Sequence, residues 1–189
     1  MASSPRPHAL EIASTWDGCP LPPEAVSRVS LGLGRGVLTV TVEAPFYDDP
    51  PPVMPDSRVN PAAPGPTWKL WEHEVVEVFI AGPGERYTEI ELGPWGHYLV
   101  LRLEGRRNVV ERVGQLDVAV TREAGRWRAE AHLDAACLPS GPHTLNAYAI
   151  HGLGDRRCYA AAYPATRAHP APDFHRLETF QPWAESGRD

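Results

Sequence analysis

The sequence predicts an all-β protein, namely an antiparallel β-sandwich of the jelly-roll type. Its 189 residues include 21 prolines and 16 glycines, and these separate short runs rich in valine, leucine and threonine. Several runs alternate apolar and polar residues with a period of two, and no run suggests a long helix. Because a chain of this size needs only one core, we expect residues 1–189 to form a single domain.

The first two strands are predicted at residues 26–33 and 37–43, on either side of a glycine-containing turn. Strict alternation within 38–43 indicates that the pair forms a hairpin. A proline-rich loop follows at 45–66, where eight prolines remove backbone donors that a sheet requires. We expect this loop to be disordered or a surface strap, with a lid over a site as the alternative.

Seven further strands complete the predicted sandwich. They are expected at residues 74–80, 86–92, 97–104, 116–121, 126–133, 144–151 and 157–163. Glycine and proline in the connectors at 81–85 and 93–96 favour tight hairpin turns. One helical turn is expected within 133–138, and an extended tail from about residue 164, anchored by Phe174, Phe180 and Trp183.

The strands between residues 74 and 104 are predicted to carry carboxylates on one face. If both connectors close as simple hairpins, Glu77 lies opposite Glu89, and Glu91 lies opposite Tyr98. The carboxylate-rich face then collects Glu77, Glu89, Glu91, Arg102, Phe79, Tyr87 and Tyr98. The opposite, core-facing side receives Val76, Val78, Ile80, Ile90, Leu92, Leu99, Leu101 and Leu103.

Facing carboxylates repel each other unless a cation or a ligand compensates, so this face is a candidate binding surface. The ligand-binding candidates are Trp71, Glu77, Glu89, Glu91, Arg102, Tyr87 and Tyr98. Carboxylates and arginine hydrogen-bond hydroxyl groups, and an aromatic ring can stack on a pyranose. We therefore predict non-catalytic binding of a saccharide or a similar polar small molecule. An ordinary solvated outer face is the alternative that requires no ligand.

Two other functions fit the same residues. Cross-strand neighbours lie near the roughly 5 Å carboxyl separation of retaining glycosidases, so a hydrolase using Glu77 and Glu89 is the enzyme alternative. A protein-interaction module, binding through the proline-rich loop or the tail, is the third hypothesis. We assign no catalytic residue from the sequence.

Polar residues at predicted strand ends and loops form a second group of candidates. They are Arg107, Asn108, His151, Arg157, Asp173 and His175. Such positions suit ligand contacts, although each residue can equally stabilise a turn.

Metal and cofactor sites are not predicted. The run from His73 to Glu77 resembles a zinc-protease motif, but a strand separates these residues by about 13 Å, which is too far for one zinc ion. Cys19, Cys137 and Cys158 lack the paired spacing of zinc sites and the density of a disulfide scaffold. Ser140, His151 and Asp155 lack a nucleophile-elbow pattern.

Charge and hydropathy exclude other classes of partner. A net charge of −6 disfavours nucleic-acid binding, which usually requires a basic stripe. No stretch approaches 18 apolar residues, and residues 1–10 lack the apolar centre of a signal peptide. We therefore expect a cytoplasmic or nuclear protein that is neither secreted nor in a membrane.

Four motifs resemble uncharacterised protein family 0462. They are Leu-Trp-Glu-His-Glu-Val-Val-Glu at 70–77, Gly-Arg-Arg-Asn-Val at 105–109, Ala-Ile-His-Gly at 149–152 and Pro-Asp-Phe-His at 172–175. The resemblance covers most of the chain outside the proline-rich loop. That family has no established activity, so the resemblance implies a fold more than a function.

A weaker similarity runs through Trp71 and residues 76–80, 87–92 and 94–96 to DOMON-like domains and to family 9 carbohydrate-binding modules. Those domains are β-sandwiches. In family 9 modules, tryptophans clamp a terminal sugar, while acidic, amide and arginine groups bind its hydroxyls. The similarity implies Trp71 and Glu77 as the matching residues, although the chain has glycine at position 93 where such modules commonly have asparagine.

Overall fold

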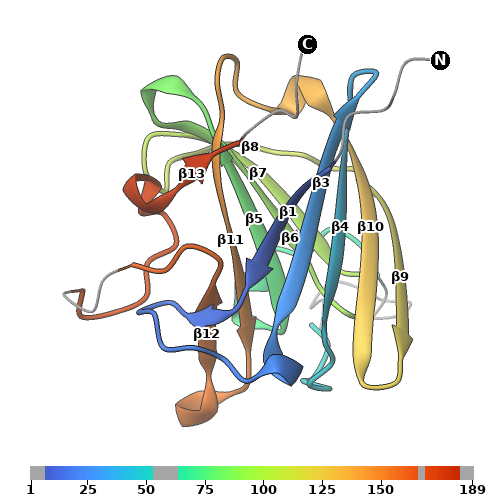
Figure 1. Ribbon diagram of the computed structural model, residues 1–189. Helices are drawn as coiled ribbons and strands as arrows, with labels where there is room; N and C mark the ends of the chain where they lie inside the picture. The colour runs from blue at the N-terminus through green and yellow to red at the C-terminus, as the bar shows by residue number, and fades with distance from the viewer. Residues whose placement is uncertain (1–6, 53–63, 166–168, 184–189) are drawn as a thin grey trace.

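The protein is a sandwich of two antiparallel β-sheets, as the computed structural model in Figure 1 shows. The structure describes residues 7–52, 64–165 and 169–183. The smaller sheet has the order β1 (His8–Ile12), β3 (Ser27–Gly34), β4 (Val37–Pro45), β10 (Arg126–Asp134) and β9 (Asp117–Glu123). This architecture confirms the predicted antiparallel β-sandwich.

The larger sheet carries the functional features. Its order is β2 (Ser14–Thr15), β12 (Cys158–Ala161), β11 (Thr144–His151), β5 (Val75–Ala81), β6 (Arg86–Leu92), β7 (Tyr98–Glu104) and β8 (Val109–Arg112), and β13 (Gln181–Pro182) also pairs with β11. Six single-turn 3-10 helices lie in the described connections: η1 (Pro23–Ala25), η2 (Leu70–Glu72), η3 (Pro83–Glu85), η4 (Ala135–Cys137), η5 (Gly154–Arg156) and η6 (Leu177–Thr179). Within the described ranges, no helix is long and apolar enough to cross a membrane.

The nine predicted strands are all present, with boundaries that differ by a few residues. Strands β1, β2, β8 and β13 were not predicted, because they are short or lack clear alternation. The turn η4 lies within the predicted helical turn at 133–138. The predicted proline-rich loop at 45–66 begins at the last residue of β4, and residues 53–63 lie outside the described part of the chain.

The main core lies between the two sheets. The larger sheet contributes Val76, Val78 and Ile80 of β5, and the smaller sheet contributes Leu38 and Val42 of β4. All five side chains are buried. Because alternate residues of each strand point to the same face, these apolar positions hold the sheets together.

A second apolar cluster lies on the other face of the larger sheet. It contains Leu70, Val75, Phe79, Ala81, Tyr87, Leu99, Leu101, Leu103, Tyr148, Ile150, Ala161, Phe174 and Phe180. The turn η2 and residues 172–180 cover this face, and Figure 1 shows the latter segment on the side away from the smaller sheet. Every residue of β5 is therefore buried, whichever way its side chain points.

The observed register corrects part of the predicted carboxylate-rich face. Glu77 lies opposite Glu91, and Glu89 lies opposite Phe79, so the pairing of β5 with β6 differs by two residues and leaves the faces unchanged. In contrast, β7 differs by one residue, because Leu92 pairs with Tyr98. A shift of one residue reverses every side chain of a strand.

The reversal of β7 moves two predicted ligand-binding residues away from the carboxylates. Tyr98 belongs to the core between the sheets, where its hydroxyl accepts a hydrogen bond from the Leu116 N–H at 3.3 Å. Arg102 lies on that same side of the strand and pairs with Glu111 of β8 at 2.5 Å. Leu99, Leu101 and Leu103, predicted for the core between the sheets, belong instead to the second cluster. All five side chains therefore lie on the side of β7 opposite to the predicted one, and the predicted placement is wrong.

Candidate functional site

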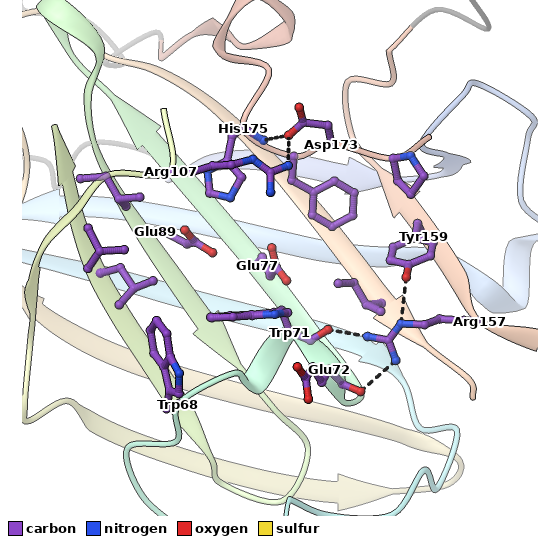
Figure 2. A pocket seen from close by; sticks show the side chains of 16 residues that line it. Trp68, Trp71, Glu72, Glu77, Glu89, Arg107, Arg157, Tyr159, Asp173 and His175 are labelled. Carbon is purple, nitrogen blue, oxygen red and sulfur yellow. Dashed lines mark hydrogen bonds and ion pairs between the residues drawn. The ribbon is translucent and has the colours of Figure 1, made fainter. Parts of the chain in front are cut away.

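A pocket of about 620 Å³ opens on the outer face of the larger sheet. Figure 2 shows Glu77 of β5 and Glu89 of β6 at its floor. Its remaining lining residues are Trp68, Trp71, Glu72, Leu101, Leu103, Arg107, Val109, Ile150, Arg157, Tyr159, Pro172, Asp173, Phe174 and His175. The pocket is thus bounded by the sheet, by the segment around η2 and by the C-terminal segment.

The floor contains carboxyl groups that are almost removed from solvent. Glu77 is 2% exposed and Glu89 is 3% exposed, and Glu91 lies fully buried next to Glu77 across the strand pair. Glu77 Oε1 and Glu89 Oε2 have no hydrogen-bond partner among the described residues. Buried polar atoms are normally paired, so the two carboxyl groups, which line the pocket, are candidates for contact with a ligand.

Burial governs the protonation of these carboxyl groups. It raises the pKa of Glu77 well above its usual range, and the negative charge of Glu89 raises that pKa further. Burial likewise raises the pKa of Glu89 to about 7, with Arg107 opposing the shift. The pKa of Glu91 is raised by burial and then by Glu77 and Glu89. The floor is therefore partly protonated at neutral pH.

Aromatic rings form the walls on either side of the floor. Trp71 meets Trp68 edge to face, with ring centroids 4.9 Å apart, and the Arg112 guanidinium lies 3.6 Å from the centroid of Trp68. On the other side, Phe174 lies with its edge towards Tyr159, at a centroid distance of 6.1 Å. Such rings offer flat apolar surface to a ring-shaped or cationic ligand.

Arg157 fixes the position of the Trp71 wall. It donates hydrogen bonds to the backbone carbonyls of Trp71 and Glu72, the latter at 2.9 Å, and its Nε donates to the Tyr159 hydroxyl at 3.1 Å. Figure 2 shows these three contacts at the edge of the pocket. Arg157 also donates to the carbonyl of Gly152, which has a positive φ of 79° and leaves no room for a Cβ against the Arg156 backbone. This turn therefore requires glycine.

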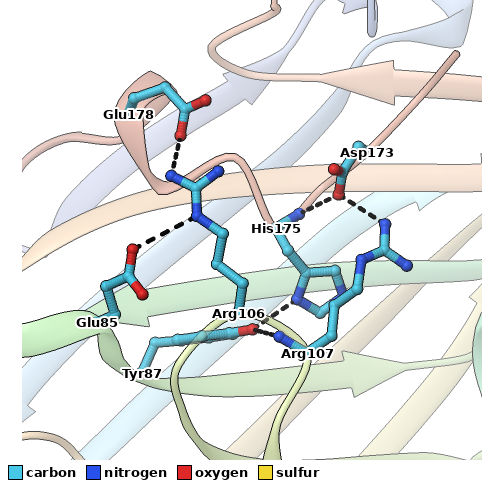
Figure 3. Close-up of polar contacts among 7 residues, drawn as sticks. All are labelled: Glu85, Tyr87, Arg106, Arg107, Asp173, His175 and Glu178. Carbon is cyan, nitrogen blue, oxygen red and sulfur yellow. Dashed lines mark hydrogen bonds and ion pairs between the residues drawn. The ribbon is translucent and has the colours of Figure 1, made fainter.

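Arg107 and Asp173 join the β7–β8 turn to the C-terminal segment (Figure 3). The Arg107 guanidinium lies 2.7 Å from Asp173, which also accepts the backbone N–H of His175 at 3.0 Å. The Tyr87 hydroxyl accepts the Arg107 N–H at 2.8 Å and lies 2.7 Å from His175 Nδ1. Burial, and then Arg107, lowers the pKa of His175 to about 4. The imidazole is therefore neutral at pH 7, and Tyr87 donates to it.

The neighbouring Arg106 adds a second connection between the same two segments. Its guanidinium pairs with Glu178 at 2.8 Å and with Glu85 at 3.5 Å. Figure 3 shows that this pair of contacts is separate from those of Arg107. Together the two arginines hold residues 173–178 against the turn that follows β7.

The structure brings seven of the sequence-predicted residues to the pocket. They are Trp71, Glu77, Glu89, Arg107, Arg157, Asp173 and His175. Glu91 and Tyr87 do not line it but lie directly behind residues that do. Glu91 lies opposite Glu77 in the strand pair, and Tyr87 contacts His175.

Four predicted residues lie elsewhere. Besides Tyr98 and Arg102, Asn108 caps its own turn by donating to the Glu104 carbonyl at 2.9 Å. His151 stacks on Tyr47, with ring centroids 3.5 Å apart. These contacts explain Asn108 and His151 as structural residues outside the pocket.

Sequence reasoning missed several lining residues, notably Trp68, Tyr159 and Phe174. Phe174 stands between the candidates Asp173 and His175, and Trp68 is three residues before Trp71. Their proximity to named candidates was therefore an available signal. Tyr159 had none, because its strand carries no polar pattern.

No three His, Cys, Asp or Glu side chains in the described ranges are arranged to hold a metal ion. The carboxyl floor lies between the aromatic walls of the pocket. Its chemistry combines buried hydrogen-bonding groups with aromatic walls.

Comparison with known proteins gives clear relatives by sequence, while no protein-family model matches the chain. The UPF0462 protein C4orf33 homolog of Rattus norvegicus is 40% identical over 181 residues, covering 93% of this chain and 87% of the relative. The human UPF0462 protein C4orf33 is 39% identical over 179 residues, covering 91% and 85%. Identity of this extent over nearly the whole length reflects common ancestry.

Comparison of structures identifies similar folds. A protein from Bacteroides uniformis, described as a candidate carbohydrate-binding protein, matches with a TM-score of 0.67 and 11% identity over 92% of this chain and 84% of its own. A family 9 carbohydrate-binding module from Caldicellulosiruptor kristjanssonii, in complex with cellotriose, matches with a TM-score of 0.45 and 10% identity, covering 85% and 72%. The first similarity shows a shared β-sandwich fold.

Proposed function

The chain belongs to the UPF0462 family, and from this premise we propose that it binds a saccharide or a similarly polar small molecule in the pocket between Trp71 and Phe174. One observation carries the proposal. Two buried carboxyl groups, each with one oxygen that has no hydrogen-bond partner among the described residues, lie at the floor of a pocket of about 620 Å³ between aromatic walls. Concave sites that combine apolar walls with a few convergent polar groups are typical of small-molecule binding.

The size and chemistry of the pocket suit a monosaccharide or a terminal sugar. Its volume falls within the usual range for ligand pockets, roughly 300–1,000 Å³. Carboxyl oxygens accept hydrogen bonds from hydroxyl groups, and the face of Trp71 offers a stacking surface. The description of the Bacteroides protein accords with this ligand class, although its likeness to this chain is one of fold.

We further propose that binding is non-catalytic and takes place inside the cell. Cys137 and Cys158 are free thiols, which suits a reducing compartment. A pair of glycosidase carboxyls requires one ionised group and one protonated group. Here burial raises the pKa of both Glu77 and Glu89 in the same direction, which favours binding over turnover.

A glycosidase-like hydrolase remains the second candidate function. The observation in its favour is that Glu77 and Glu89 both face one pocket, on neighbouring strands, with a pKa near neutrality for Glu89. A hydrolase predicts slow release of sugar from aryl glycosides that is abolished in Glu77→Gln or Glu89→Gln. Binding without release, lost in the same variants, would favour the first proposal.

A thermal-shift screen against monosaccharides, oligosaccharides, polyols and sugar phosphates tests the proposed function. A ligand present at 100 times its dissociation constant stabilises the folded state by about 2.7 kcal/mol. For a chain of this length that corresponds to a rise in Tm of about 5–10 °C.

The matched variants are Glu77→Gln and Glu130→Gln. Glu130 is a carboxylate of the smaller sheet that pairs with Arg128 and His132. We expect the saccharide-induced shift to disappear in Glu77→Gln and to persist in Glu130→Gln. The absence of any shift across the panel, or an equal shift in both variants, would contradict binding in this pocket.

A further inference from the structure

The carboxyl groups of the floor lack an ion-pair partner among the described residues. Among the described residues, no ion pair includes Glu77, Glu89 or Glu91. Glu77 and Glu89 are each more than nine-tenths buried, and Figure 2 shows both projecting into the pocket. Buried carboxylates are costly unless a cation or a set of donors satisfies them. The floor therefore has capacity for a positive group that the described chain does not supply.

The two arginines that line the pocket are engaged elsewhere. Arg107 pairs with Asp173 at 2.7 Å. Arg157 donates to the backbone carbonyls of Trp71, Glu72 and Gly152 and to the Tyr159 hydroxyl. Redirecting either guanidinium to the floor would break these contacts, so neither is the missing partner.

The remaining ionisable group of the wall does not repel a cation. Burial keeps the His175 imidazole neutral at pH 7, since its pKa is lowered to about 4. Among lining residues, four carry carboxyl groups and two carry guanidinium groups. Glu72 pairs with Lys69 and Asp173 with Arg107, while Glu77 and Glu89 have no such partner and Glu91 adds a fifth carboxyl beneath the floor. Carboxyl groups thus outnumber the fixed cations of the pocket.

The walls also suit a positive ligand. Trp71, Tyr159 and Phe174 surround the floor with aromatic rings, whose faces attract cations. A neutral hydroxyl placed between Glu77 and Glu89 would not favour the ionised form of either carboxyl group, whereas an ammonium group would stabilise both carboxylates and donate three hydrogen bonds. The combination of acidic floor and aromatic wall therefore distinguishes amine ligands from neutral ones.

We propose that the preferred ligand is an amine-bearing sugar, whose protonated amine sits over Glu77 and Glu89 while its ring lies between Trp71 and Phe174. This inference rests on the proposed function and specifies the ligand class. The ammonium supplies the counter-charge that the floor lacks. The hydroxyl groups of the sugar meet the polar rim.

Isothermal titration of the full chain with three sugars of the same ring tests this inference. Glucosamine carries the ammonium, N-acetylglucosamine replaces it by a neutral amide, and glucose replaces it by a hydroxyl. At pH 6.5 we expect glucosamine to bind at least tenfold more tightly than either neutral sugar. Glu77→Gln and Glu89→Gln should each reduce glucosamine affinity at least tenfold and remove the preference, while Glu130→Gln should retain both.

Glu77→Asp provides a second variant that keeps the negative charge. It should preserve a preference for glucosamine over N-acetylglucosamine even if the shorter side chain weakens binding of all three sugars. The melting temperature of each variant, measured without ligand, separates loss of binding from loss of folding.

The outcomes separate this inference from the proposed function. Equal affinity for the three sugars, or tighter binding of a neutral one, overturns the amine preference while leaving saccharide binding in this pocket intact. Failure of all three to bind overturns the amine preference, and failure of the whole thermal-shift panel as well overturns the proposed function. Ethanolamine, an amine without a sugar ring, completes the set: binding as tight as that of glucosamine would overturn the role of the sugar ring while supporting the ammonium over the floor.

Discussion

The aromatic ring of Phe174 stacks on that of Tyr148, with centroids 3.9 Å apart and an angle of 8° between the planes. Tyr148 belongs to β11, at the centre of the larger sheet, whereas Phe174 lies in the C-terminal segment. The stack therefore fixes one wall of the pocket to its floor. Tyr148 in turn meets Phe79 edge to face at 5.5 Å, which extends the contact across to β5.

Replacing Phe174 by alanine should destabilise the protein by about 3 kcal/mol, because it removes a buried aromatic ring and its stacking partner. Chemical denaturation measures the loss. Leu153→Ala is the control, since Leu153 is 50% exposed and its truncation should change stability by less than about 0.5 kcal/mol. Similar losses in the two variants would contradict an anchoring role for Phe174.

Substituting the two residues of the Arg107–Asp173 ion pair should reduce the free energy of unfolding by unequal amounts. Arg107→Ala removes an exposed pair and should cost less than about 1 kcal/mol. Asp173→Ala should cost about 1–2 kcal/mol, because it also leaves the backbone N–H of His175 without its acceptor. Denaturation of both variants at low and high salt measures the difference, and equal losses would show that the backbone contact contributes nothing.

The stability of the unliganded protein should fall as the pH rises from 6.5 to 8.5. The pKa of Glu89 is raised from 4.5 to about 7 on folding, so its folded form is favoured while protonated and loses stability as pH rises through 7. The pKa values of Glu77 and Glu91 are also raised on folding, so their ionisation likewise lowers the stability of the folded state as the pH rises. The pKa of His175 is lowered, which has the opposite effect, but only below about pH 6.5.

Most of the cost of ionising Glu89 falls between pH 4.5 and 7, so Glu89 alone should account for a loss of about 1 kcal/mol between pH 6.5 and 8.5. With Glu77 and Glu91 acting in the same direction, we expect a decrease in Tm of a few degrees over this range. Thermal denaturation across the pH series tests it. The slope should become shallower in Glu89→Gln and remain unchanged in Glu130→Gln. A Tm that stays constant from pH 6.5 to 8.5 would show that the floor carboxyls ionise normally.

Trp71→Ala should weaken saccharide binding at least tenfold, which is equivalent to about 1.4 kcal/mol. The saccharide to use is one that stabilises the protein in the thermal-shift screen. The substitution removes the stacking surface but keeps the backbone carbonyl that accepts from Arg157. Isothermal titration below the Tm of each variant gives the affinities. Trp183→Ala is a matched control, because Trp183 contacts His8 and His143 rather than the pocket. Unchanged affinity in Trp71→Ala would exclude this wall from binding.

Strand positions were predictable because turns rich in glycine and proline separate them clearly. The hairpin β3–β4, with Gly34 and Gly36 at its turn, illustrates this, since alternation along β4 also identified the core-facing side. Short edge strands such as β8 were missed. All four of its residues are exposed, so no apolar pattern identifies it.

The orientation of β7 could not be predicted from its residues. Apolar side chains occupy both of its faces, with Val100 in the core between the sheets and Leu101 in the second cluster. A period of two identifies the buried face only where the other face is polar. The length of the turn after β6 then determines the register, and Leu92 pairs with Tyr98 rather than with His97.

The site was predictable where charge interrupted an apolar strand. Glu77 and Glu89 stood out for this reason, and a shift of two residues between β5 and β6 left them on the same face. Tyr159 reaches the pocket only through tertiary folding of a segment distant in sequence. Nothing local to this aromatic residue distinguishes a pocket wall from a core position.

The location of the C-terminal wall has a consequence for biosynthesis. Asp173, Phe174 and His175 follow in sequence every strand that contributes to the floor. A chain that emerges from the ribosome N-terminus first can pair β5, β6, β7 and β11 before this wall is available. During that interval Glu77 and Glu89 remain hydrated and charged, so the nascent sheet is spared the cost of burying them until the last segment arrives.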